Sequence, residues 1–209
     1  MTSPRTAAVA RFAIAAALAL PVAAARAQDP GKAAQHQPSA AEQAMMEKYM
    51  KAATPGPEHQ KLAKLAGKWK LQVTSWFAPG APPQKSEGTA EFKSMLGGRY
   101  VTEEVHGSMG DQQPFEGRGL SGFDNVTREN FVVWVDSMST GPMLMRGKCA
   151  VEAKKCALKG RAPDPVAGKE VPYSNTTTMT DDDHFTFALY GPGPGGKTFK
   201  MLEIAYTRQ

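Results

Sequence analysis

The feature that most constrains the fold is a long series of short segments in which apolar residues recur at every second position. About ten such segments follow one another between Trp69 and Arg208, and turn residues such as Gly97-Gly98 and Asp124-Asn125 separate them. No insert between them is long enough for a crossover helix, so the sheet must be an antiparallel meander. The expected strands span Trp69–Phe77, Thr89–Leu96, Tyr100–His106, Phe115–Phe123, Asn130–Asp136, Met143–Cys149, Cys156–Arg161, Val171–Met179, His184–Tyr190 and Thr198–Arg208.

About ten antiparallel strands on this length form either a two-sheet sandwich or a closed up-and-down β-barrel. Closure leaves no exposed edge, so we favour the barrel. One or two short helices precede it: Ser39 and Glu42 match a capping box before a helix over 40–53, and a second short helix covers 58–66. We therefore assign 39–67 to a helical prelude and 68–209 to the barrel domain.

Residues 1–27 have the pattern of a cleavable signal peptide. Arg5 and Arg11 precede the apolar run Phe12–Leu20, and an Ala-x-Ala site ends at Ala27. The apolar run is too short for a membrane-spanning helix, and we expect no membrane span. The protein is expected in the periplasm or outside the cell, with cleavage after Ala27 and a flexible leader over 28–38.

Removal of this segment changes the charge of the chain. It leaves 22 basic and 20 acidic side chains, so the net charge falls from +5 to +2. We find no stripe of Lys and Arg interleaved with aromatic residues, and we therefore expect no nucleic-acid partner.

The chain has two cysteines, Cys149 and Cys156, and an exported protein meets oxidising conditions. Their spacing permits a disulfide across a hairpin. A metal pair or a redox pair is the alternative, but no further Cys or His lies nearby and the spacing is not Cys-x-x-Cys.

Several short motifs are similar to those of a known bacterial family. They are Leu65-Ala-Gly67-Lys-Trp69, Leu96-Gly-Gly-Arg-Tyr100, Phe115-Glu-Gly117 with Gly119, Gly122-Phe-Asp-Asn125, Trp134-Val-Asp-Ser137 and Met201-Leu-Glu-Ile-Ala-Tyr-Thr-Arg208. Together they resemble the domain of unknown function 1579 family over residues 60 to 208. The resemblance implies a lipocalin-like barrel, often exported, with no established activity. Family members often carry an arginine in the strand that here reads Val171-Pro-Tyr-Ser-Asn175, so this chain departs from the family there.

No group of residues forms a catalytic motif. A Gly-x-Ser-x-Gly elbow is missing, and of the four histidines only His106 and His184 fall on expected strands. The run Asp181–Asp183 lacks the spacing of a calcium loop. The methionines near Met143 lack a His or Cys partner for copper. We expect no catalytic residue, no metal and no cofactor.

The interior face of the strand 100–106 is open to two interpretations. Tyr100, Thr102, Glu104 and His106 share one face, whereas Val101, Glu103 and Val105 share the other. If the first face lines the interior, polar groups would be available there for a ligand; if the second does, the polar set is solvated. The side chains that we expect to contact a ligand in the interior are Trp76, Tyr100, Glu104, His106, Arg118, Trp134, Asp136 and Tyr206.

Three functions are compatible with this sequence. The favoured one is a barrel that holds a small apolar or amphipathic ligand. The second is an interaction or structural protein with a filled barrel, and the third is an enzyme of unrecognised type. The oligomeric state does not follow from the sequence.

Overall fold

The computed structural model describes residues 37–109 and 113–209, which contain two α-helices, ten strands and one short 3-10 helix. The predicted signal peptide, 1–27, lies outside the described residues, as does the leader up to residue 36. The elements are α1 (Ala40–Ala53), α2 (Pro57–Ala63), β1 (Gly67–Ser75), β2 (Gln84–Met95), β3 (Tyr100–Met109), β4 (Gln113–Asp124), β5 (Glu129–Asp136), β6 (Met143–Gly147), β7 (Lys155–Asp164), β8 (Lys169–Met179), β9 (His184–Pro192), η1 (Pro194–Gly196) and β10 (Thr198–Arg208).

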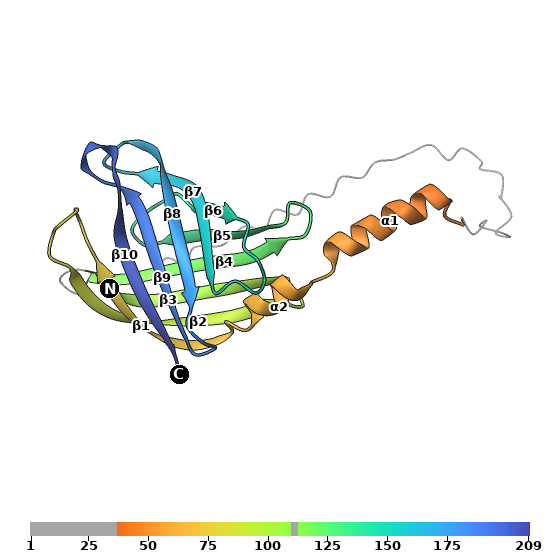
Figure 1. The fold of residues 1–209 in the computed structure, drawn as a ribbon, viewed down its shortest axis with the longest axis horizontal. Coiled ribbons are helices and arrows are strands. Elements are labelled where there is room, and N and C mark those ends of the chain that lie inside the picture. Colours follow the sequence, from red (N-terminus) through yellow and green to blue (C-terminus); the bar gives the residue numbers. More distant parts are fainter. Residues whose placement is uncertain (1–36, 110–112) are drawn as a thin grey trace, which may run out of the picture. The chain divides into compact units, whose positions relative to one another are not determined.

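The ten described strands form one closed antiparallel barrel (Figure 1). Each strand pairs with the next one along the chain, and β1 pairs with β10 from Trp69↔Arg208 to Ser75↔Leu202. The predicted up-and-down barrel is therefore confirmed, and the two-sheet sandwich is excluded. Closure gives every strand a partner on both sides, which leaves no open edge for another chain.

Residues alternate between the interior and the outer surface along each strand. On β1, Trp69 and Leu71 are buried whereas Lys68 and Lys70 are exposed. On β3, the buried residues Val101 and Val105 fix the inward face. Of the two interpretations of this strand, the one with the valines inside is thus correct, and Glu103 points inward with them.

An aromatic cluster fills the interior on the side of β1, β2 and β9. Trp69 is fully buried and meets the Phe185 ring edge-on at 4.9 Å, while Phe185 stacks on Tyr206 at 4.1 Å. Phe92 completes the cluster, at 6.2 Å from Trp69. Each such ring pair contributes about 0.5–1.5 kcal/mol beyond the burial of its area, so this side of the barrel is its rigid half.

The short helix α2 lies across the barrel end at which β1 begins. The indole nitrogen of Trp69 donates to the Leu65 carbonyl oxygen at 2.9 Å, and Leu62 and Leu65 pack against the core. His59 is buried, and its ring meets Phe123 edge-on at 5.7 Å. α2 is thereby attached to both sides of the barrel. We call this end the helix end.

Helix α1 differs from α2, because it has no buried residue. Its large apolar side chains Met45, Met46 and Tyr49 are each more than half exposed. The Asn125 side chain donates to the carbonyl oxygens of Ala52 and Thr54 at 3.0 and 2.8 Å, and so fixes the link between α1 and α2.

Arg208 ties the last strand to the first strand and to the helix end. Its guanidinium lies over the Trp69 ring, 4.2 Å from the ring centroid. It donates to the carbonyl oxygens of Lys64, Ala66 and Asp182 and to the Asp183 carboxylate, at 2.8–2.9 Å. One side chain of the last strand therefore binds backbone acceptors just before the first strand and in the link between β8 and β9.

We expect Arg208→Ala to lower the free energy of unfolding by about 3 kcal/mol, because several charge-assisted hydrogen bonds and a cation–π contact are lost together. Urea unfolding followed by tryptophan fluorescence measures this change. Arg161→Ala is the matched control, because Arg161 is 58% exposed in a surface ion pair and its loss should cost less than about 1 kcal/mol. Equal losses in the two variants would contradict the role given to Arg208.

Candidate functional site: the barrel interior

The interior of the barrel is packed unevenly. On β1 to β3, Leu71, Phe92 and Val101 point inward and are at most 6% exposed. On β5 and β8, Val132 and Thr177 also point inward but keep partial exposure, although Leu158 on β7 between them is buried. Val132 and Thr177 therefore border space that the protein does not fill.

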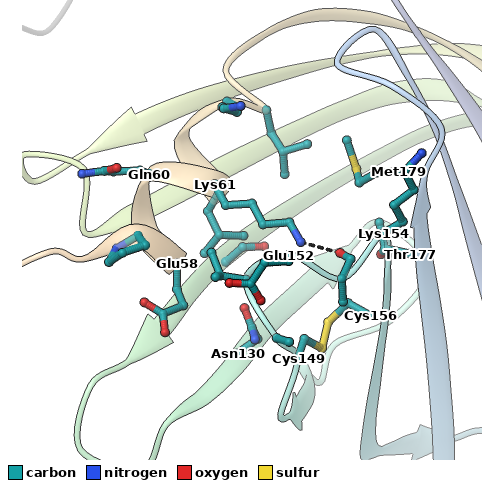
Figure 2. A pocket seen from close by; sticks show the side chains of 18 of the residues that line it. Glu58, Gln60, Lys61, Asn130, Cys149, Glu152, Lys154, Cys156, Thr177 and Met179 are labelled. Carbon is teal, nitrogen blue, oxygen red and sulfur yellow. Dashed lines mark hydrogen bonds between the residues drawn. A yellow bond between two sulfur atoms is a disulfide. The ribbon is translucent and has the colours of Figure 1, made fainter.

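That space is a cavity of about 530 Å³ at the helix end, which we call the lumen cavity (Figure 2). It lies between α2, the loop 148–154 and the inward faces of β4, β5, β7 and β8. Its apolar lining includes Leu62, Leu65, Val132, Leu158 and Met179. A volume of this size lies within the range of small-molecule sites, about 300–1,000 Å³.

The mouth of the lumen cavity is held by a disulfide and a hydrogen bond, both visible in Figure 2. The predicted disulfide between Cys149 and Cys156 is confirmed, with a Cα–Cα distance of 5.3 Å. It closes the loop 148–154, and Lys61 of α2 donates to the Ala153 carbonyl oxygen of that loop at 2.6 Å. The strand β6 ends at Gly147, two residues before the predicted end, so Cys149 belongs to this loop.

Charges of both signs surround this mouth. The lining includes three lysines and four acidic residues: Lys61, Lys64, Lys154, Glu58, Glu152, Asp181 and Asp182. Glu58 is engaged by Arg128. The mouth is therefore polar without a dominant sign.

The deepest charged group described in the interior is Glu103. Its inward neighbours along β3 are Val101 and Val105, and it accepts a hydrogen bond from the Tyr206 hydroxyl at 2.9 Å. Burial raises the pKa of Glu103 to about 7, and the bond from Tyr206 lowers it in part. Burial also raises the pKa of Tyr206, and the neighbouring carboxyl raises it further. The pair is a carboxyl group that changes charge near neutral pH beside a hydroxyl that stays protonated.

Glu103 nevertheless keeps part of its surface accessible. Because Glu103 is also strongly desolvated, its accessible surface borders space inside the barrel rather than bulk solvent. In the strand pairing, Glu103 of β3 lies opposite Gly119 of β4, and Gly119 lies opposite Trp134 of β5. The next inward residues toward the helix end, Ser121 and Val132, line the lumen cavity. Successive inward residues are about 7 Å apart along a strand, so Glu103 lies one layer deeper than the cavity lining.

Trp134 lies flat against two glycines of β4. A Cβ atom on Gly117 would come within 2.2 Å of the indole ring, and one on Gly119 within 3.4 Å of both Trp134 and Glu103. The indole nitrogen donates to Asp136 at 2.8 Å, and Asp136 also accepts the Met138 backbone N–H at 3.0 Å. The two glycines thus provide the room for an aromatic wall beside the buried carboxyl.

A second buried polar residue, Asn175, lies on β8. It is 4% exposed, and its amide nitrogen donates to the Met145 sulfur at 3.0 Å. Its side-chain oxygen finds no hydrogen-bond partner among the described residues. A buried acceptor without a partner costs about 1–3 kcal/mol, so its retention needs an explanation.

The structure divides the predicted ligand-contacting residues into two groups. Trp134, Asp136 and Tyr206 face inward. Tyr100, Glu104, His106, Arg118 and Trp76 face outward. Glu104 forms an outer ion pair with Arg118 at 2.7 Å and lies 3.4 Å from His106, and Lys200 covers the Trp76 ring at 4.9 Å. The expected interior placement of these five residues is corrected, because the valines of β3 occupy the inward face.

Sequence reasoning placed Glu103 on a face with Val101 and Val105 but did not select it as a site residue. A charged residue between two apolar residues of the same face was the available signal. Asn175 gave a weaker signal, since an amide in a Thr- and Ser-rich strand is common on an exposed face. Within 37–109 and 113–209, no group of three or more His, Cys, Asp or Glu side chains is arranged to hold a metal ion.

Fold and site together define a small closed antiparallel barrel with a partly filled interior. Residues 54–208 match the family described as Protein of unknown function (DUF1579), and the chain belongs to this family. No curated protein matches the chain. In the part of the chain that the structure describes, the helices are too short or too polar to cross a membrane.

Two solved structures are similar to this chain, and the first of them supports the fold alone. The crystal structure of Rv2717c from M. tuberculosis matches with a TM-score of 0.58 and 17% identity, over 75% of this chain and 99% of that one. A redesigned β-barrel matches with a TM-score of 0.40 and 15% identity, over 71% of this chain and 95% of that one.

We expect the stability of the protein to fall as the pH rises from about 4.5 to about 7. In this window the folded protein keeps a proton on Glu103 that the unfolded chain, with an ordinary glutamate pKa of 4.5, has released. The part of this fall in the free energy of unfolding that Glu103 causes is about 3 kcal/mol, and it should be absent in Glu103→Gln. Urea unfolding at several pH values measures it.

Glu104→Gln is the matched control, because it makes the same change on the outer face of the same strand. It should keep the pH dependence of the wild type. A fall in stability that persists unchanged in Glu103→Gln would contradict the buried, proton-binding state of Glu103.

Proposed function

We propose that this protein is an exported binding protein whose barrel holds one small apolar or amphipathic molecule. The observation that carries the proposal is the lumen cavity, about 530 Å³ with an apolar lining, in a barrel that is otherwise well packed. A pocket of this size, with an apolar floor and a polar mouth, can take up a small apolar molecule in place of water.

The alternative of an interaction protein requires a filled barrel, and the lumen cavity with its partly exposed inward residues Val132 and Thr177 argues against it. The alternative of an enzyme requires a nucleophile or a metal beside an acid or base. Glu103 is a buried group with a raised pKa, which is a feature of many active sites, but its described partner is a tyrosine of still higher pKa. Binding is therefore favoured over catalysis.

We expect Thr177→Phe to weaken ligand binding about tenfold or more, because Thr177 lines the lumen cavity and a benzyl group there fills part of it. The uncharged dye Nile red, whose fluorescence rises in apolar surroundings, is a suitable probe. Thr178→Phe adds the same group to the exposed outer face of the same strand and should leave the affinity unchanged.

Urea unfolding of both variants controls for loss of folding. The proposal fails if the wild type does not bind Nile red and if protein purified from its own host carries no small molecule in native mass spectrometry. It also fails if Thr177→Phe and Thr178→Phe bind the dye equally well.

We further propose that export removes residues 1–27. The disulfide between Cys149 and Cys156 supports this, since such bonds persist in oxidising compartments. Intact-mass measurement of the protein isolated from its host should give a chain that begins at Gln28. A cytoplasmic chain that keeps its first 27 residues and has free thiols would contradict the proposal.

A further inference from the structure

Two buried polar groups in the interior of the barrel share a chemical character. The carboxyl group of Glu103 and the side-chain oxygen of Asn175 are acceptors, and the latter finds no partner among the described residues. The potential donors next to them are engaged, because the Tyr206 hydroxyl bonds to Glu103 and the Asn175 amide to Met145. A molecule that completes these bonds must bring hydrogen-bond donors.

Between its two rims, the interior as formed by the described strands has no positively charged side chain. On the described strands, the inward positions that carry a cation are Arg208 at the helix end and Lys169 at the opposite rim. Arg208 is engaged by Asp183 and three carbonyl oxygens, and Lys169 is exposed. An anionic ligand would therefore meet a carboxyl group in the interior without a counter-ion, and burial of an unpaired charge costs several kcal/mol.

Aromatic rings flank the carboxyl group of Glu103. Tyr206 bonds to it directly, and Trp134 lies on the adjacent wall, one position beyond Gly119. The faces of such rings attract cations, by about 0.5–2 kcal/mol or more when water is excluded. Carboxylate and aromatic faces in a desolvated space are the combination that recognises organic ammonium groups.

We infer that the barrel selects apolar molecules that carry a cationic ammonium group, with Glu103 as the counter-ion and the lumen cavity as the place for the apolar part. The inference rests on the proposed binding function and specifies the chemical class of its ligand. Charge is the deciding property: the ammonium donates to the Glu103 carboxylate and neutralises it. The raised pKa of Glu103 agrees with this arrangement, because a carboxylate without a cation nearby is costly in this position.

Three probes with the same alkyl chain separate charge from apolarity: dodecylamine, dodecanol and dodecanoate, each used below its micellar concentration to displace Nile red from the full mature chain at about pH 8. We expect dodecylamine to bind about tenfold or more tighter than dodecanoate, with dodecanol between them. Glu103→Gln should weaken the binding of dodecylamine about tenfold and leave the affinity for dodecanol unchanged. Glu104→Gln, with the same charge change on the outer face, should bind all three as the wild type does.

The outcomes distinguish this inference from the function on which it rests. If dodecanol displaces the dye but dodecanoate binds as tightly as dodecylamine, the barrel binds ligands but does not select a cationic group, and the inference is wrong. The same conclusion follows if Glu103→Gln binds dodecylamine as the wild type does while urea unfolding shows it to be folded. If the wild type binds neither Nile red nor any of the three probes, the binding function itself is wrong.

Discussion

The structure depends on the closure of β1 with β10 around Trp69. A meander of ten strands has two free edges until its first and last strands pair, and this pairing joins the two ends of the barrel domain. Arg208 stabilises this pairing and so offsets part of the entropy lost on closure. Its guanidinium stacks on Trp69 and binds the backbone oxygens of Lys64 and Ala66. The same contacts attach α2, which forms one wall of the lumen cavity.

The closure also explains why the interior is asymmetric. The aromatic cluster of Trp69, Phe92, Phe185 and Tyr206 packs along the seam and makes that side rigid. On the opposite wall, Ser121 and Thr177 are small inward residues that border the lumen cavity. A rigid seam and a thinly lined wall leave a cavity without loss of the fold.

Residue patterns predicted the strand number, the antiparallel order and the disulfide, because each depends on local spacing. Both helices were also expected close to where they occur, although α2 ends at Ala63 rather than 66. Residue patterns did not show which face of β3 points inward, because Glu103 and Glu104 are consecutive and carry the same charge on opposite faces. Only the packing of Val101 and Val105 against the aromatic cluster decides between them. That is a tertiary effect with no counterpart in local spacing.

A buried carboxyl group and a buried acceptor without a partner both oppose folding, and this barrel has one of each. An apolar residue at either position would stabilise the isolated fold. Such local departures from good packing are expected where a protein has a function to perform. Glu103 lies one layer below the lumen cavity, and Trp134 is seated beside it by Gly117 and Gly119. The unfavourable group and its aromatic neighbour therefore occupy the part of the barrel where a ligand would offset their cost.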